Sequence, residues 1–120
     1  MSSLLAPGAS LERLYTGTEW GEGPVWLPGI GALRWSDIPN NRIMQYHAED
    51  GRTVVYREQV EFTNGRTLDL DGAVVQCSHG RRAVEREAGR EVTVLVDRWL
   101  GKRLNSPNDV VVAADGSIWF

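Results

Sequence analysis

The chain has 120 residues with a formal net charge of −3, 42% hydrophobic residues, 24% charged residues and one cysteine, Cys77. This length suffices for one modest domain, and the acidic balance argues against non-specific nucleic-acid binding. A single cysteine excludes an intrachain disulfide, and no apolar stretch approaches the roughly 18 residues of a membrane helix. Residues 1–7 lack the basic and apolar segments of a signal peptide. We therefore expect a cytoplasmic protein with neither nucleic-acid nor membrane partners.

Residues 1–20 are expected to form a lead-in with one strand near residues 11–15. Beyond it, apolar residues alternate with a period near two, and Gly, Asn, Asp or Pro interrupts them, which predicts short strands and no long helix. A first unit is expected to contain strands at residues 24–27, 32–37, 42–47 and 53–56. A second unit is expected to contain strands at residues 66–70, 73–78, 83–87 and 92–96. Residues 97–104 are expected to form a loop, and a third unit opens at Ser106 with strands at residues 110–112 and 117–120.

Three polar residues recur at a regular spacing, each at the start of an apolar stretch. Glu22 and Asn64 are 42 residues apart, and Asn64 and Asn108 are 44 residues apart. A repeat of about 40 to 45 residues built from short strands is typical of a β-propeller blade. The sequence therefore predicts an all-β protein, a β-propeller of about two and a half blades. The three polar side chains are expected to meet at the mouth of its central channel.

The chain ends within an apolar strand, at Phe120, and two and a half blades cannot close a ring. We expect residues 1–120 to be the amino-terminal part of a single propeller domain. The alternative is a chain that completes its sheets by forming an oligomer through their exposed edges.

Gly21 and Gly23 on either side of Glu22 let the backbone turn sharply, and Pro24 fixes the direction of the strand that follows, so the carboxylate is presented from a stiff corner. A carboxylate accompanied by amide oxygens is the ligand set that Ca²⁺ prefers, and the alternative is a carboxylate bonded to nearby amides or simply solvated. Asn108 follows a Ser-Pro pair and opens a strand, where it is either a ligand or an ordinary Asx turn.

Asn64 precedes Gly65, and this pair is also a strong signal for a type I′ turn. Arg66 either reaches into the channel to hold an anionic or hydroxyl-rich ligand, or is a surface charge. His79 is a general base, a partner of a ligand or a local hydrogen-bonding residue. The arginines between residues 81 and 90 alternate with Glu85 and Glu87, which favours a solvated hairpin.

Three segments resemble a known family: residues 22–26 (EGPVW), residues 64–66 (NGR), and residues 101–120 (GKRLNSPNDVVVAADGSIWF). They are similar to the SMP-30/gluconolactonase/luciferin-regenerating-like family. The resemblance implies a six-bladed propeller with one divalent metal in its channel, Ca²⁺ or alternatively Zn²⁺, Mg²⁺ or Mn²⁺. It implies that Glu22 and Asn108 bind the metal, and that Asn64, Arg66, Asn108 and Asp109 line the substrate pocket.

The reaction that the resemblance implies is hydrolysis of a sugar lactone to an aldonic acid. Its general base is an aspartate on a later blade, expected beyond Phe120, so no catalytic residue is assigned in this chain. The alternative is a non-catalytic or inactive propeller fragment that acts as a binding module.

Overall fold

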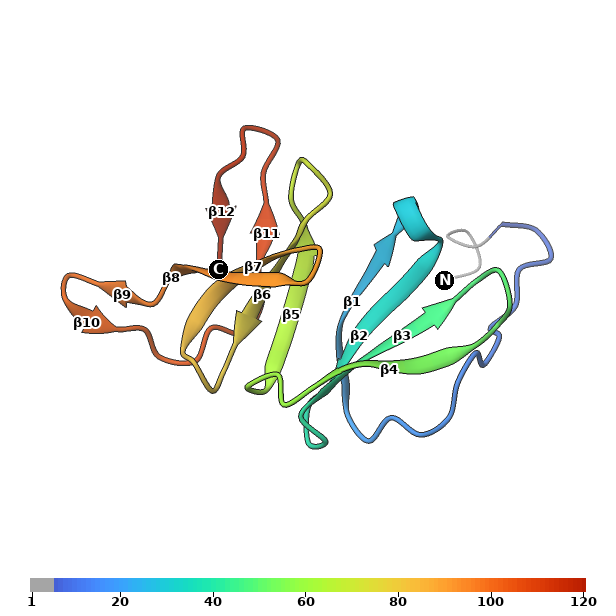
Figure 1. The fold of residues 1–120 in the computed structure, drawn as a ribbon. Helices are drawn as coiled ribbons and strands as arrows, with labels where there is room; N and C mark the ends of the chain where they lie inside the picture. Colours follow the sequence, from blue (N-terminus) through green and yellow to red (C-terminus); the bar gives the residue numbers. More distant parts are fainter. Residues whose placement is uncertain (1–5) are drawn as a thin grey trace.

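The computed structural model describes residues 6–120 and shows two four-stranded antiparallel sheets side by side, followed by two short hairpins (Figure 1). Residues 1–5, on which part of the expectation about a signal peptide rests, lie outside the described residues. Within residues 6–120, no helix has the length and apolar character needed to cross a membrane.

The first sheet has the strand order β1-β2-β3-β4, and its strands are Gly21–Leu27, Ala32–Asp37, Arg42–His47 and Thr53–Glu58. The second has the order β5-β6-β7-β8, with strands Thr63–Leu68, Val74–Ser78, Ala83–Ala88 and Glu91–Val96. A 3-10 helix, η2, occupies Pro28–Ile30 between β1 and β2. Each sheet is one propeller blade, and the repeat predicted from the sequence is confirmed.

Two hairpins follow the second blade. β9 (Arg98–Trp99) pairs with β10 (Lys102–Arg103), and β11 (Val111–Val112) pairs with β12 (Ile118–Trp119). The first hairpin lies where a loop was expected, and the second opens the third blade. β1 packs against β5 and β5 packs against β11, so the first strands of consecutive blades are neighbours. This arrangement brings together the polar residues that begin those strands.

The apolar core lies between the second blade and the third. Val75, Cys77 and Val84 of the second blade pack with Val110, and partly buried Val96, Val112 and Ile118 pack against them. Side chains on a strand alternate between its two faces, so residues 75 and 77 of β6 face the same way. The Cys77 thiol is fully buried, and burial together with the charge of Asp109 raises its pKa to about 12.

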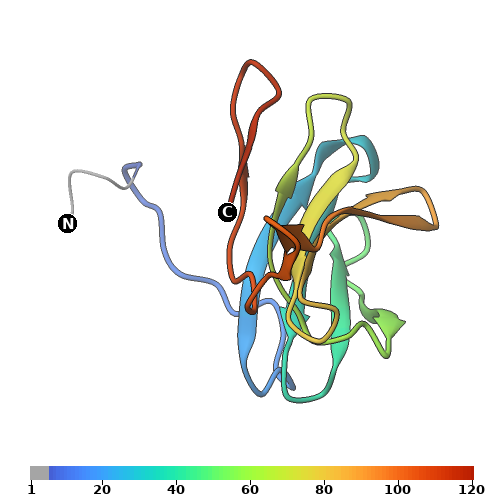
Figure 2. The same cartoon turned by 90° about the vertical axis from the view of Figure 1, so that its left-hand side faces the viewer.

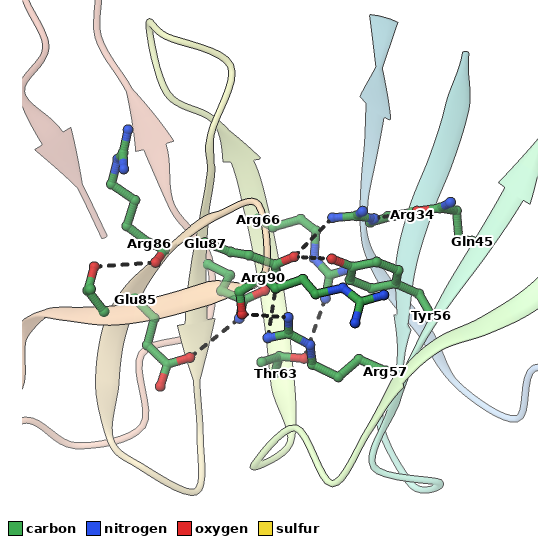
Figure 3. Close-up of polar contacts among 12 residues, drawn as sticks. Arg34, Gln45, Tyr56, Arg57, Thr63, Arg66, Glu85, Arg86, Glu87 and Arg90 are labelled. Carbon is green, nitrogen blue, oxygen red and sulfur yellow. Dashed lines mark hydrogen bonds and ion pairs between the residues drawn. The ribbon is translucent and has the colours of Figure 1, made fainter. Parts of the chain in front are cut away.

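The opposite face of the second blade is polar, and there one expectation was wrong. Glu85 and Glu87 are only 2% and 3% exposed, whereas a solvated hairpin was expected. Figure 3 shows Glu87 meeting Arg34 and Tyr56 of the first blade, at the contact between the two sheets. Period-two alternation places residues 85 and 87 on the face of β7 that points toward the first blade. Glu87 is therefore part of the contact between blades, whereas Glu85 is held within the second blade by Gln76 and Arg81.

The lead-in and one turn also differ from expectation. Residues 11–15 form no strand, and the segment from residue 6 to about residue 14 runs outside the sheets (Figure 2). The type I′ turn considered for Asn64 and Gly65 is wrong because both lie within β5, and neither has a positive φ. Contacts with the neighbouring blades override the local preference of the Asn-Gly pair for a turn. The carbonyl oxygen of Asn64 accepts a hydrogen bond from Ser36, and the N–H of Gly65 donates to the carbonyl oxygen of Asn108.

The end of the lead-in is tied to the first blade by a buried carboxylate. Asp37 is completely buried, and its Oδ1 accepts hydrogen bonds from the backbone N–H of Glu19 at 3.1 Å and of Trp20 at 3.3 Å. Its Oδ2 accepts from Asn40 at 3.0 Å and from Arg42 Nε and Nη2 at 2.9 and 2.8 Å. Burial raises the pKa of Asp37, but hydrogen bonds from Arg42, Asn40, Trp20 and Glu19 outweigh it and hold the pKa below its usual value.

We expect Asp37→Asn to lower the free energy of unfolding at pH 7 by about 1.5–3 kcal/mol, because hydrogen bonds to a charged group are lost. A carboxyl whose folded pKa is depressed contributes its full stability above the unfolded pKa of about 3.9, and loses it as pH falls through the folded pKa. The variant should therefore lose less stability than the wild type between pH 5 and pH 2 (on the order of the same 1.5–3 kcal/mol), as measured by urea unfolding. Asp97→Asn, at an exposed ion pair, is the control. An equal deficit at pH 2 and at pH 7 would contradict the role of the charge.

Candidate functional site

The first strands of the three blades surround one depression of about 300 Å³. Its lining comes from three short segments, namely residues 22–24 of β1, residues 64–67 of β5 and residues 108–111 at the start of β11. Glu22, Asn64, Arg66, Asn108 and Asp109, the residues singled out from the sequence, all belong to this lining. The repeated positions of the sequence therefore lie together in the fold, as the spacing predicted.

Close contact between neighbouring strands sets the dimensions of the depression. Gly23 has a φ of +56°, and an added Cβ there would collide with the carbonyl oxygen of Asn64 and lie 2.9 Å from the Cα of Gly65. At Gly65 an added Cβ would collide with the carboxylate of Asp109 and lie 2.6 Å from its Cα. The two glycines occupy corresponding places in consecutive blades. Each lets its strand approach the next blade, a use of glycine that no other residue type supplies.

Hydrogen bonds between blades hold the starts of these strands next to one another. Ser36 Oγ donates to the carbonyl oxygen of Asn64 at 3.2 Å, and the N–H of Gly65 donates to the carbonyl oxygen of Asn108 at 2.8 Å. The register of β1 shifts between Glu22 and Val25, and that of β5 shifts between Thr63 and Arg66. Such irregularities change the direction of a side chain beside a site. The backbone therefore positions the three polar residues together.

Glu22 is exposed, and its carboxylate Oε1 accepts a hydrogen bond from the indole N–H of Trp20 at 3.2 Å. Within residues 6–120, neither Glu22 nor Asp109 takes part in an ion pair. Asp109 and Asn108 are also exposed, and Asp109 Oδ1 accepts from the N–H of Val110 at 2.9 Å. The depression therefore carries two carboxylates that form no ion pair with a described side chain.

Asn64 is 4% exposed, and its side-chain amide nitrogen donates to Nε2 of His79 at 3.1 Å. An amide nitrogen only donates, so Nε2 of His79 is the acceptor in this bond. This bond engages one N–H of the Asn64 amide and orients the side chain. The amide oxygen is then the group that can accept a hydrogen bond from a ligand or bind a cation. Of the three readings of His79, the structure shows local hydrogen bonding.

Arg66 is 5% exposed and lies between the first two blades, where Figure 3 shows it beside Thr63. One of its terminal nitrogens donates to Ser36 Oγ and, at 3.4 Å, to Thr63 Oγ1. Its Nε is buried and has no hydrogen-bond partner among the described residues. Burial lowers the pKa of Arg66 to about 10. The guanidinium is thus held by two hydroxyl groups, and no ion pair with a described carboxylate involves it.

The donor atoms of the depression fit part of the shell of a hard divalent cation. Glu22 offers a carboxylate, and Asn64 and Asn108 offer amide oxygens, which are the ligands of Ca²⁺. Within residues 6–120, no group of three or more His, Cys, Asp or Glu side chains is placed to hold a metal ion. A cation here would therefore depend on one or two carboxylates, with amide oxygens completing what this chain supplies.

Sequence reasoning missed two groups that support the site. Trp20 bonds directly to Glu22, and Asp37 holds the backbone of Trp20. The spacing of Trp20 and Glu22 by two residues was a usable signal, because such residues lie on one side of an extended chain. Two other cavities, of about 410 and 420 Å³, lie away from the predicted residues and have mainly apolar linings.

The fold and the site define a β-propeller whose first strands present oxygen donors around one depression. A sequence profile of the SMP-30/Gluconolactonase/LRE-like region matches residues 20–120, and the chain belongs to this family. It is 29% identical over 136 aligned positions to a gluconolactonase of Zymomonas mobilis, an alignment that covers the whole chain and 38% of the relative.

Two solved structures are similar over most of the chain. A gluconolactonase of Xanthomonas campestris is 44% identical with a TM-score of 0.84, over 89% of this chain and 36% of its own. A putative gluconolactonase is 41% identical with a TM-score of 0.89, over 96% of this chain and 40% of its own. The chain thus spans well under half the length of these relatives.

Proposed function

We propose that this chain forms the amino-terminal part of a single propeller domain that hydrolyses a sugar lactone to an aldonic acid with a divalent cation, Ca²⁺ in the first instance. The observation that carries the proposal is the shared depression, where Glu22, Asn64 and Asn108 meet although 42 and 44 residues separate them. The family and the gluconolactonase relatives support the reaction class.

Each lining residue has a role that follows from its chemistry. Glu22 holds the cation with its carboxylate, and Asn108 either completes the shell or binds the substrate through its amide. A bound divalent cation supplies Lewis-acid polarisation of a carbonyl group. Asn64, held by His79, accepts a hydrogen bond from a sugar hydroxyl through its amide oxygen.

The remaining two residues of the proposed substrate pocket differ in burial. Asp109 is exposed and accepts hydrogen bonds from sugar hydroxyls, which are donors as well as acceptors. Arg66 contributes positive charge from the lining of the depression, which favours the negative charge that develops on the carbonyl oxygen of the lactone when water attacks. The general base that activates this water is proposed to lie outside this chain.

The test is hydrolysis of δ-gluconolactone by the whole protein, with Ca²⁺ present. Glu22→Gln keeps the size and polarity of the side chain but removes its charge, and we expect kcat/KM to fall on the order of 100-fold. The matched control is Glu58→Gln, at an exposed position at the end of β4, which should leave kcat/KM unchanged.

Loss of hydrolysis in Glu22→Gln together with a normal unfolding midpoint would support the proposal. Equal kcat/KM in Glu22→Gln and the wild type would refute the site. A wild-type protein that binds the lactone without hydrolysing it would instead favour the alternative, a binding module.

A further inference from the structure

We propose that Trp20 is a positioning residue of the cation site, holding the Glu22 carboxylate in one orientation through its indole N–H. This inference rests on the proposed function because it assumes that Glu22 binds the cation. Trp20 is not itself a ligand of the cation in this proposal, and it acts through Glu22.

The direct contact is the hydrogen bond from Trp20 Nε1 to Glu22 Oε1, at 3.2 Å. Trp20 immediately precedes β1, and residue 22 is the second residue of that strand. The chain bends at residues 19 and 20 as it enters β1, and at this spacing of two residues the indole reaches the carboxylate. An indole nitrogen only donates, and it is therefore matched to a carboxylate oxygen.

The backbone of Trp20 is held independently of this contact. Its N–H donates to the buried carboxylate of Asp37 at 3.3 Å, and its carbonyl oxygen accepts from the N–H of Ile38 at 3.1 Å. Arg42, which also bonds Asp37, donates to the carbonyl oxygen of Gly17 at 2.9 Å. The indole thus projects from a rigid support, although 59% of Trp20 is exposed to solvent.

A fixed donor has a specific consequence for an exposed carboxylate. A free glutamate samples several rotamers, and the conformational entropy lost when a cation orders the side chain weakens binding. Holding Oε1 restricts the carboxylate before the cation arrives. Hydrogen bonds of this kind to metal ligands typically change metal affinity 10- to 100-fold.

The experiment uses Tb³⁺ as the probe for a site of oxygen ligands in the whole protein. Titration followed by indole-sensitised Tb³⁺ emission gives both an affinity and a measure of how near a tryptophan lies to the ion. We compare the wild type with Trp20→Phe, which keeps an aromatic ring and removes the donor. Trp26→Phe is the matched control, because Trp26 is also an exposed tryptophan and lies within β1.

We expect Trp20→Phe to bind Tb³⁺ about 10-fold more weakly or worse, and to lose most sensitised emission at saturation. Trp26→Phe should stay within about twofold of the wild type in affinity. Asp37→Asn, which loosens the support of Trp20, should also weaken binding while circular dichroism shows a folded protein. A Trp20→Phe affinity equal to that of Trp26→Phe would overturn the inference.

Glu22→Gln in the same titration separates the two proposals. If it abolishes high-affinity Tb³⁺ binding while Trp20→Phe has no effect, the inference about Trp20 is wrong and the cation site stands. If Glu22→Gln binds Tb³⁺ as the wild type does, the cation site itself is wrong, and the role of Trp20 falls with it.

Discussion

Replacing Gly23 with alanine is expected to lower the free energy of unfolding by about 3–5 kcal/mol. Two costs combine at this position. The φ of +56° is unfavourable for any residue with a Cβ, and that Cβ would collide with the backbone of Asn64 in the next blade. Because the obstacle is backbone rather than a flexible side chain, β1 and β5 must move apart. Urea unfolding of the whole protein measures the loss.

Gly31→Ala is a closely matched control. Gly31 has a φ of +57°, and an added Cβ there meets nothing within 4 Å. The free energy of unfolding of the control should therefore fall only by the cost of a left-handed backbone conformation, about 1–2 kcal/mol. The difference between the variants measures the contact between blades. Equal losses at Gly23 and Gly31 would show that β1 and β5 do not approach as closely as the structure has them.

Replacing Glu87 with alanine should lower the free energy of unfolding by about 3–5 kcal/mol, as is typical when one partner of a buried ion pair is removed. Glu87 lies 3.2 Å from Arg34 Nη1 and 3.6 Å from Arg57 Nη1, and it accepts a hydrogen bond from Tyr56 (Figure 3). Without it, the two arginines lose their carboxylate at the contact between blades. Unfolding in urea is again the measurement.

Glu91→Ala, at an exposed position in β8, is the control and should change stability by less than about 0.5 kcal/mol. Glu87→Gln adds a spectroscopic readout. Burial raises the pKa of Tyr56, and the hydrogen bond and charge of Glu87 raise it further. The glutamine variant removes that charge, so tyrosinate absorbance should show one tyrosine titrating at a lower pH than in the wild type. An unchanged titration would place Tyr56 away from Glu87.

Local patterns sufficed for the blades and for the place of the candidate site. Period-two alternation and turn residues predicted all eight strands of the first two sheets, with ends that differ by at most three residues. The offset between Glu22, Asn64 and Asn108 predicted that they lie together, because equivalent positions of consecutive blades are neighbours. The roles of these residues as ligands stay predictions.

Contacts between blades could not be predicted from local alternation, turn residues or spacing. Glu85 and Glu87 alternate with arginines, a local pattern that normally indicates solvated charge, yet both are buried. Glu87 is buried against Arg34 and Tyr56, which come from the first blade. The Asn64-Gly65 pair favours a turn locally, but the glycine is needed for close approach to Asp109, 44 residues further along the chain. Long-range packing decided both cases.

The most direct test of the proposed cation site is the position of a bound cation. Crystals of the whole protein soaked with Tb³⁺ give an anomalous difference map that locates the ion without assumptions about its ligands. We expect a peak in the depression between Glu22 and Asn108, with the Glu22 carboxylate at about 2.3–2.6 Å from the ion, the distance typical of a hard cation of this size. A fully occupied ion whose ligands do not include Glu22 would contradict the proposed site.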